Sequence, residues 1–286
     1  MGAIGYAVES GIALVTIDRP DKLNALTLEM YDDLARSFDR ARDDDSVGVV
    51  IVTGAGERAF CVGADLHESI PALASGRFDI SHWDGAHQKH TTLFKPVIAA
   101  VNGLCLGGGL ELMLSTDLRI CSAEARFGLP ESGIGVVPAG GTLTRLVRQV
   151  PYAFAMELML LGEQIDAGEA ARIGLVNRVV PAGQVLEAAH TLAERLLTRS
   201  GSALELIKSS VLQLSDMPAE AAFHAEALYG QKAFASTDAQ EGIAAFAERR
   251  PAVFPTRSGL TGATKPPARN VAVRQCGPRP HGSSVQ

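Results

Sequence analysis

The chain has 286 residues, of which 47% are hydrophobic and 20% are charged, and its formal net charge is −6. This length suits one large domain with an appendage, and the composition is ordinary for a globular protein. The acidic balance argues against general nucleic-acid binding, because contacts to phosphates require a net basic face.

The N-terminal stretch carries Glu9 and Asp18 and has no basic cluster, so we expect no secretory signal. No apolar run approaches the roughly 20 residues that a bilayer span requires, so we expect no membrane association. The cysteines lack the spacing of a metal site, and they are Cys61, Cys105, Cys121 and Cys276. Buried free thiols in a reducing, cytoplasmic compartment are the expectation, with no metal.

Alternating apolar residues predict a hairpin formed by residues 3–8 and 12–17. A loop follows, and Thr27 is a good N-cap for an amphipathic helix that ends near Arg42. Residues 47–53 are almost continuously apolar, which predicts a strand buried on both faces.

Residues 54–59 spell G-x-G-x-x-A after this strand, which resembles a dinucleotide-binding fingerprint. That motif requires a helix to begin at its glycines. Here residues 60–64 continue as another extended segment, so we interpret the motif as a turn between strands. We therefore expect no nicotinamide cofactor.

We expect a short helix to begin at residues 65–68, then a loop of low order over 71–82 and a helix over 83–93. His87 and His90 could be read as a metal pair. Because no third ligand is in view, a solvated helix face is the favoured interpretation. The loop between residues 68 and 85 is expected to border a binding site.

The stretch from residue 96 to 131 contains the candidate catalytic residues. An apolar strand over residues 96–101 runs into three glycines, 107–109, and then into a helical pattern. Glycines where a strand meets a helix allow backbone N–H groups to approach a ligand closely. Glu111 lies about one helical turn past Gly108, so both can face the same side. With Glu131 twenty residues later, the stretch predicts a proton-transfer site with donors for a developing anion.

The remaining pattern predicts an α/β core followed by helices. Further strands are expected over residues 117–122, 125–127 and 176–180, and a loop over 133–141. Helices are expected over residues 142–149, 152–161, 166–173, 184–199, 203–214, 218–234 and 237–249. We divide the chain into a core (1–200), a C-terminal helical subdomain (201–257) and a tail (258–286). The tail is rich in proline and basic residues and lacks apolar periodicity, so disorder is expected there.

Several stretches in sequence order match one family. They are RPDKLNAL (19–26), AFCVGADL (59–66), AVNGLCLGGGLEL (100–112), FGLPE (127–131), GLVNRVV (174–180) and EGIAAFAERR (241–250). From residue 11 to about 257 the chain resembles the crotonase, or enoyl-CoA hydratase/isomerase, superfamily. The resemblance implies a crotonase-like α/β spiral of ββα units, with C-terminal helices that serve trimerisation as a homotrimer or a dimer of trimers.

The resemblance also implies an acyl-CoA thioester as ligand, and addition of water to a trans-2-enoyl-CoA as the activity. Coenzyme A would enter as part of the substrate, with no separate cofactor. The family's oxyanion donors correspond to the backbone N–H groups of Ala64 and Gly108, and its two carboxylates to Glu111 and Glu131. Its substrate-binding positions correspond to Lys22, Leu23, Ala25, Val62, Asp65, Leu66, Leu104 and Pro130.

Two of these positions also have a local interpretation. Lys22 is the cation we expect to meet the phosphates of coenzyme A. Asp65 is either a wall of the pocket or a helix N-cap, and a cap there would also fix the Ala64 N–H.

One loop departs from the family. The pattern P-G-A-G-G-T-Q-R-L becomes PAGGTLTRL at residues 138–146, with the glycines one position earlier. We expect this shift to alter the acyl pocket but not the reacting centre. Alternatives remain open: an enoyl-CoA isomerase, a dehydratase of a specialised hydroxyacyl-CoA, or an acyl-CoA-binding or RNA-binding relative without turnover.

Overall fold

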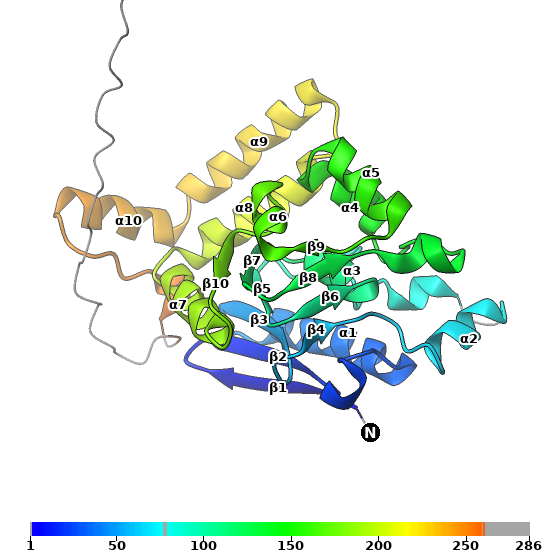
Figure 1. Ribbon diagram of the computed structural model, residues 1–286. Helices are drawn as coiled ribbons and strands as arrows, with labels where there is room; N and C mark the ends of the chain where they lie inside the picture. The colour runs from blue at the N-terminus through cyan, green and yellow to red at the C-terminus, as the bar shows by residue number, and fades with distance from the viewer. Residues whose placement is uncertain (1, 77–78, 259, 261–286) are drawn as a thin grey trace, which may run out of the picture.

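Two sheets form the core of the protein (Figure 1), and the computed structural model describes residues 2–76, 79–258 and 260. The six-stranded sheet has the order β1 (Ala3–Glu9), β2 (Ile12–Asp18), β3 (Val49–Gly54), β5 (Val97–Val101), β7 (Leu118–Ser122) and β10 (Arg178–Val180). The four-stranded sheet has the order β4 (Ala59–Cys61), β6 (Leu104–Leu106), β8 (Arg126–Gly128) and β9 (Ile165–Asp166).

The chain winds between the two sheets as a spiral. Three consecutive strand pairs, β3–β4, β5–β6 and β7–β8, each place one strand in the larger sheet and the next in the smaller one. Within these three pairs, successive strands of each sheet are parallel neighbours, as the pairings of β3 with β5 and of β4 with β6 show. The flanking pairs β1–β2 and β8–β9 are antiparallel. The expected spiral of two stacked sheets is confirmed.

Strand β3 shows why its sequence is continuously apolar. Val50 and Val52 face the core between the two sheets, whereas Val49 and Ile51 face the opposite side. There they pack against α7 (Val185–Leu197), which covers the outer face of the larger sheet. Burial on both faces is thus confirmed for this strand.

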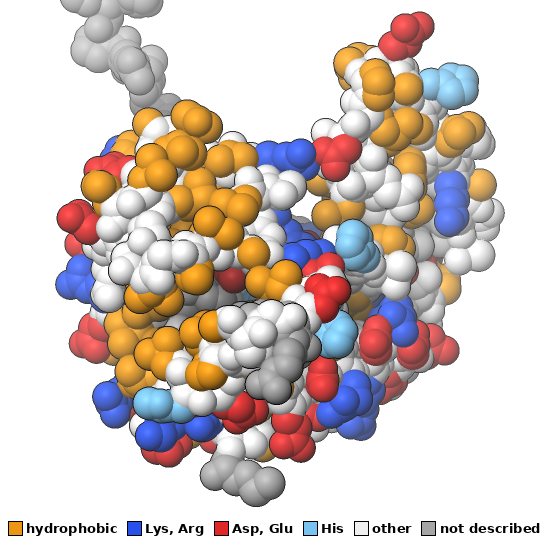
Figure 2. Space-filling view, turned by 90° about the vertical axis from the view of Figure 1, so that its right-hand side faces the viewer, with side chains coloured by type: hydrophobic (Ala, Val, Ile, Leu, Met, Phe, Trp, Pro, Cys, Tyr) orange, Lys and Arg blue, Asp and Glu red, His pale blue; other side chains and the backbone are white. Residues whose placement is uncertain are grey.

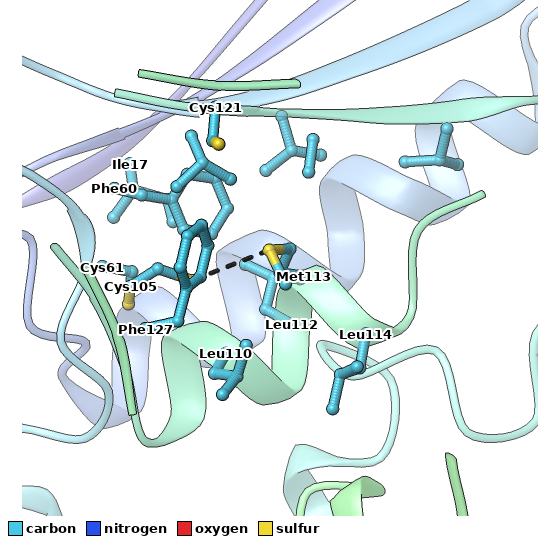
Figure 3. Packing of buried hydrophobic residues seen from close by; sticks show 14 of the residues in the cluster. Ile17, Phe60, Cys61, Cys105, Leu110, Leu112, Met113, Leu114, Cys121 and Phe127 are labelled. Atoms are coloured by element: carbon cyan, nitrogen blue, oxygen red, sulfur yellow. Dashed lines mark hydrogen bonds between the residues drawn. The ribbon is translucent and has the colours of Figure 1, made fainter. Parts of the chain in front are cut away.

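Helix α3 (Gly108–Leu114) lies under the larger sheet, and every one of its residues is buried. Figure 3 shows Leu110, Met113 and Leu114 within the hydrophobic core, with the Cys105 thiol 3.9 Å from the Met113 sulfur. Packing on all sides leaves this helix no freedom to shift. The polar residue that it carries, Glu111, is therefore held at a fixed place.

The predicted helices are mostly present. Thr27 caps α1 (Leu28–Asp43) by accepting a hydrogen bond from the Met30 N–H at 3.2 Å. The others are α4 (Thr142–Gln149), α5 (Tyr152–Leu161), α6 (Ala167–Arg172), α8 (Gly201–Leu214), α9 (Ala219–Phe234) and α10 (Thr237–Ala247).

The segment after residue 65 was predicted only in part. The expected short helix is present but begins at Ser69, as α2 (Ser69–Ala74), and a 3₁₀ turn (Ile80–Trp83) replaces part of the loop expected over 71–82. The helix expected over 83–93 is absent: the 3₁₀ turn is followed by irregular turns. Disorder was expected for the tail, residues 258–286, of which 259 and 261–286 lie outside the described residues.

The C-terminal helices leave much apolar surface uncovered. Helix α9 stands away from the sheets in Figure 1, and none of its side chains is buried. Figure 2 shows patches of hydrophobic side chains over the face it draws. Exposed apolar residues on α8, α9 and α10 are Ile207, Val211, Leu212, Phe223, Leu228, Phe234, Ile243 and Phe246. A surface of this kind indicates an interaction with another protein surface.

Candidate active site

The backbone around Ala64 is held in an extended conformation by Leu26. The Leu26 N–H donates to the Gly63 carbonyl at 2.8 Å, and the Asp65 N–H donates to the Leu26 carbonyl at 2.9 Å. Because N–H groups alternate in direction along extended chain, the Ala64 N–H points to the opposite side. That side faces the start of α3: a Cβ placed on Gly108 would lie 3.7 Å from the Ala64 nitrogen.

The start of α3 supplies a second N–H group. Gly107 is the N-cap of the helix, so the first N–H groups, including that of Gly108, have no acceptor within the helix. A Cβ on Gly63, whose φ is +91°, would lie 2.7 Å from the Gly108 nitrogen, and a Cβ on Gly109 would lie 2.1 Å from the Cys61 carbonyl oxygen. Glycines thus permit the two segments to touch. The backbone nitrogens of Ala64 and Gly108 therefore lie on two segments in direct contact.

A buried asparagine secures this arrangement, and the sequence interpretation missed it. The Asn24 side-chain amide donates to the carbonyls of Ala59 (2.7 Å) and Ala55 (3.0 Å), and its oxygen accepts from the Arg19 N–H (2.9 Å). Asn24 has a φ of +58°, a conformation that asparagine tolerates better than most residues. It thereby fixes β4, which leads directly into Gly63 and Ala64.

Asp65 acts as a cap. One of its carboxylate oxygens accepts from the N–H groups of His67 (2.8 Å) and Glu68 (3.0 Å), and the other pairs with Arg19 at 2.6 Å. The hydrogen bond from Arg19 is the main cause that lowers the pKa of Asp65. The charge of Arg19 is thus engaged by Asp65, which leaves Lys22 as the exposed cation of this loop.

Glu111 is a buried carboxyl, with 6% of its surface exposed. Burial, and then the negative charge of Glu131, raise the pKa of Glu111 to about 7; contacts with Gly140 and Thr142 oppose the shift. The Gly140 N–H donates to Glu111 at 2.6 Å, and a Cβ on Gly140 would lie 2.6 Å from the other carboxyl oxygen. The loop with the shifted glycines thus touches Glu111 directly, and its effect on the acyl pocket stays a prediction.

Glu131 reaches the same place from a 3₁₀ turn, Pro130–Ile134. A Cβ on Gly107 would lie 3.0 Å from one of its carboxyl oxygens. The other oxygen is buried and has no hydrogen-bond partner within the described part of the chain. Burial raises the pKa of Glu131. Both carboxyls thus lie around the start of α3, next to the two N–H donors.

Two further polar side chains lie beside this cluster and were not anticipated. The Tyr31 ring stacks on Trp83 with 4.2 Å between centroids, and the Tyr31 oxygen lies 2.9 Å from a Cβ position on Gly108. His87 is buried, and the expectation of a solvated histidine at this position is wrong. Its Nδ1 donates to the Trp83 carbonyl at 3.1 Å, and burial lowers the pKa of His87 to about 4, so it is neutral at pH 7.

The positions expected to bind substrate divide into three groups. Leu23 and Ala25 lie in the loop that Leu26 ties to Ala64, and Val62 precedes Gly63. Leu104 lies half-buried in β6, paired with Ala59 and Arg126. Leu66 and Pro130 are exposed beside Asp65 and Glu131, as is Lys22 at the end of a 3₁₀ turn.

Within the described residues, no group of three or more His, Cys, Asp and Glu side chains is placed to hold a metal ion. None of the described helices is long and apolar enough to cross a membrane.

A sequence model of the enoyl-CoA hydratase/isomerase family matches residues 7–257. The chain belongs to this family. Enoyl-CoA hydratase EchA19 of Mycobacterium tuberculosis is 39% identical over 249 residues, which are 85% of this chain and 93% of that protein. Carnitinyl-CoA dehydratase of Proteus mirabilis is 38% identical over 243 residues, covering 82% and 92%.

Solved structures of the family agree with this assignment. The crystal structure of enoyl-CoA hydratase from Mycobacterium tuberculosis H37Rv superimposes with a TM-score of 0.81 at 34% identity, covering 88% of this chain and 98% of that one. An enoyl-CoA hydratase from Bacillus anthracis gives a TM-score of 0.82 at 31% identity, covering 88% and 98%.

Proposed function

We propose that the protein is an enoyl-CoA hydratase that adds water reversibly to a trans-2-enoyl-CoA. One observation carries this proposal: the buried Glu111 and the half-buried Glu131 lie around a helix start where the backbone nitrogens of Ala64 and Gly108 lie on segments in direct contact. Family membership supplies the thioester as ligand.

The paired N–H groups suit the charge that forms during this reaction. When water adds to C3 of the conjugated thioester, negative charge develops on the thioester oxygen as an enolate. Two oriented donors aimed at this oxygen stabilise it, and each such donor is worth about 3 kcal/mol or slightly more. Backbone donors at Ala64 and Gly108 are already oriented by the packing of α3, so little reorganisation is needed.

The two carboxyls suit the proton transfers. One carboxylate takes a proton from the attacking water, whose oxygen bonds to C3, and the other carboxyl delivers a proton to C2. The pair must therefore share a single proton. Mutual repulsion and burial favour that state, because both raise the pKa of Glu111.

The direct test is incubation of the pure protein with crotonyl-CoA. Hydration removes the conjugation, so absorbance of the enoyl thioester should fall until equilibrium is reached. If no acyl chain length from short to long is turned over, the hydratase proposal is wrong.

The raised pKa of Glu111 predicts a pH-dependent stability. Its folded pKa of about 7 exceeds the ordinary carboxyl value of 4.5, so the folded state binds more protons between these values. The wild type should therefore lose stability relative to Glu111→Gln as the pH rises from about 4.5 to 7, with no further change above pH 8. Urea unfolding of both proteins at several pH values measures this, and parallel curves would contradict it.

A second candidate is dehydration of a specialised hydroxyacyl-CoA. The similarity to carnitinyl-CoA dehydratase favours it, and the loop with the shifted glycines contacts Glu111 through the Gly140 N–H. The reaction is the reverse of hydration and uses the same groups. Isomerisation of an enoyl-CoA differs because it requires only one carboxyl.

We further propose that the chain forms a homotrimer or a dimer of trimers. The apolar side chains exposed on α8, α9 and α10 support this, because a helix such as α9 with no buried residue requires a partner surface. A monomer in analytical ultracentrifugation would refute it.

We assign Lys22 to the phosphates of coenzyme A. We also propose a reducing, cytoplasmic location, which the free thiols of Cys61, Cys105 and Cys121 support.

A further inference from the structure

The Tyr31 hydroxyl is the most unusual polar group near the carboxyls. The side chain is 1% exposed, and its oxygen has no hydrogen-bond partner within the described residues. A buried hydroxyl is normally paired, because it loses its hydrogen bonds to water on burial. The missing partner of Tyr31 is therefore to be sought beside the start of α3, where its oxygen lies 2.9 Å from a Cβ position on Gly108.

The ring of Tyr31 is held rigidly. It stacks on Trp83 with an angle of 12° between the planes, and the His87 ring lies 5.7 Å away in a tilted arrangement. Tyr31 also belongs to the packed face of α1, whose Thr27 cap fixes the helix start. The hydroxyl is thus aimed by its surroundings, as a preorganised donor must be.

The Tyr31 oxygen lies close to the segments that carry the Ala64 and Gly108 N–H groups. A single point, the Cβ position of Gly108, lies 2.9 Å from the Tyr31 oxygen, 3.2 Å from the Gly63 Cα and 3.7 Å from the Ala64 nitrogen. The hydroxyl therefore borders the same small space as the two N–H donors.

We propose that the Tyr31 hydroxyl donates a third hydrogen bond to the thioester oxygen of the bound acyl-CoA, beside the N–H groups of Ala64 and Gly108. This assignment rests on the proposed function of the site. Tyr31 remains protonated and able to donate, since burial raises its pKa well above 10 and the nearby carboxyls act in the same direction.

The experiment replaces Tyr31 with phenylalanine, which keeps the stacked ring and removes only the hydroxyl. The probe is cinnamoyl-CoA, whose conjugated thioester absorbs at longer wavelength when donors polarise its carbonyl. Binding is measured in a Glu131→Gln background, which suppresses hydration during the measurement. Tyr6→Phe is the matched control, because the Tyr6 hydroxyl is also buried and unpaired within the described chain but lies beside Arg40, more than two turns along α1.

With an otherwise wild-type chain, Tyr31→Phe should lower kcat for crotonyl-CoA about 10- to 100-fold with little change in KM, since the hydrogen bond strengthens as charge develops. The red shift of bound cinnamoyl-CoA should shrink in the Glu131→Gln, Tyr31→Phe protein and remain in the Glu131→Gln, Tyr6→Phe protein. An equal red shift with and without the Tyr31 hydroxyl would overturn the proposal while leaving the hydratase function intact. Failure of the parent protein to bind any acyl-CoA would overturn both.

Discussion

Replacing Glu131 or Glu111 with glutamine should lower kcat for enoyl-CoA hydration by about 10²- to 10⁴-fold, the range typical of a lost general acid or base. Glutamine keeps the shape of each side chain but can neither accept nor deliver the proton. Because both carboxyls take part in one hydration, each single change should be severe, and the double change should cost little more than the worse single one.

Steady-state rates with crotonyl-CoA measure this effect, and circular dichroism checks that the variants are folded. Glu124→Gln is the matched control, because Glu124 is an exposed residue in the turn between β7 and β8. Retained hydration in Glu111→Gln, with loss only in Glu131→Gln, would contradict the two-carboxyl mechanism. It would favour an isomerase, which moves a single proton.

Replacing Gly63 with alanine should reduce kcat/KM by about 10²- to 10³-fold, comparable to the loss of one oxyanion donor. The added Cβ would lie 2.7 Å from the Gly108 nitrogen, a distance that such atoms do not tolerate. Either β4 or the start of α3 must then move, which separates the Ala64 and Gly108 N–H groups. The positive φ of Gly63 adds backbone strain.

Gly174→Ala is the control that separates backbone strain from displacement of neighbouring atoms. Gly174 has a similar φ of +81°, but a Cβ placed there meets no atom within 4 Å. It should lose stability through strain alone, of order 1 kcal/mol in urea unfolding, and keep its activity. If Gly63→Ala retains wild-type kcat/KM, the Ala64 and Gly108 pair cannot be the oxyanion site that we propose.

The sequence predicted those elements whose local pattern agrees with their tertiary environment. Strand β3 is apolar throughout because both of its faces are covered, and α4 was predicted with its observed limits, residues 142–149. The unpredicted strands β6 and β9 have only three and two residues, too few for a periodic pattern.

The error at residues 83–93 has a tertiary cause. The polar residues there suggested a solvated helix. In the structure Trp83 is buried and stacks on Tyr31, and His87, which follows it in the same turn, is buried as well. Arg145 then holds this turn by donating to the His87 and Gln88 carbonyls at 2.7 and 2.8 Å. None of these partners is near in sequence, so no local pattern could have indicated them.

Only part of the candidate site was anticipated without the family resemblance. Composition and spacing pointed to donors and carboxyls between residues 101 and 131, but the partner strand at Ala64 came from the match of motifs. The contacts that hold the site, those of Asn24 with β4 and of Gly140 with Glu111, were missed. An asparagine or a glycine within a loop has too many ordinary uses to be singled out by its sequence context.

The spiral of strand pairs has a consequence for how the protein could be divided. Ala64 follows β4, Gly108 follows β6 and Glu131 follows β8, so each successive winding of the backbone contributes one wall. No contiguous fragment that begins after residue 64 or ends before residue 131 contains all three residues, so every winding is needed. A bound acyl-CoA would accordingly clamp all the windings at once and stabilise the entire core, not a subregion. We therefore expect the chain to bind acyl-CoA only when the whole core is folded. A chain that lacks any one winding should lose its affinity for acyl-CoA completely, not gradually.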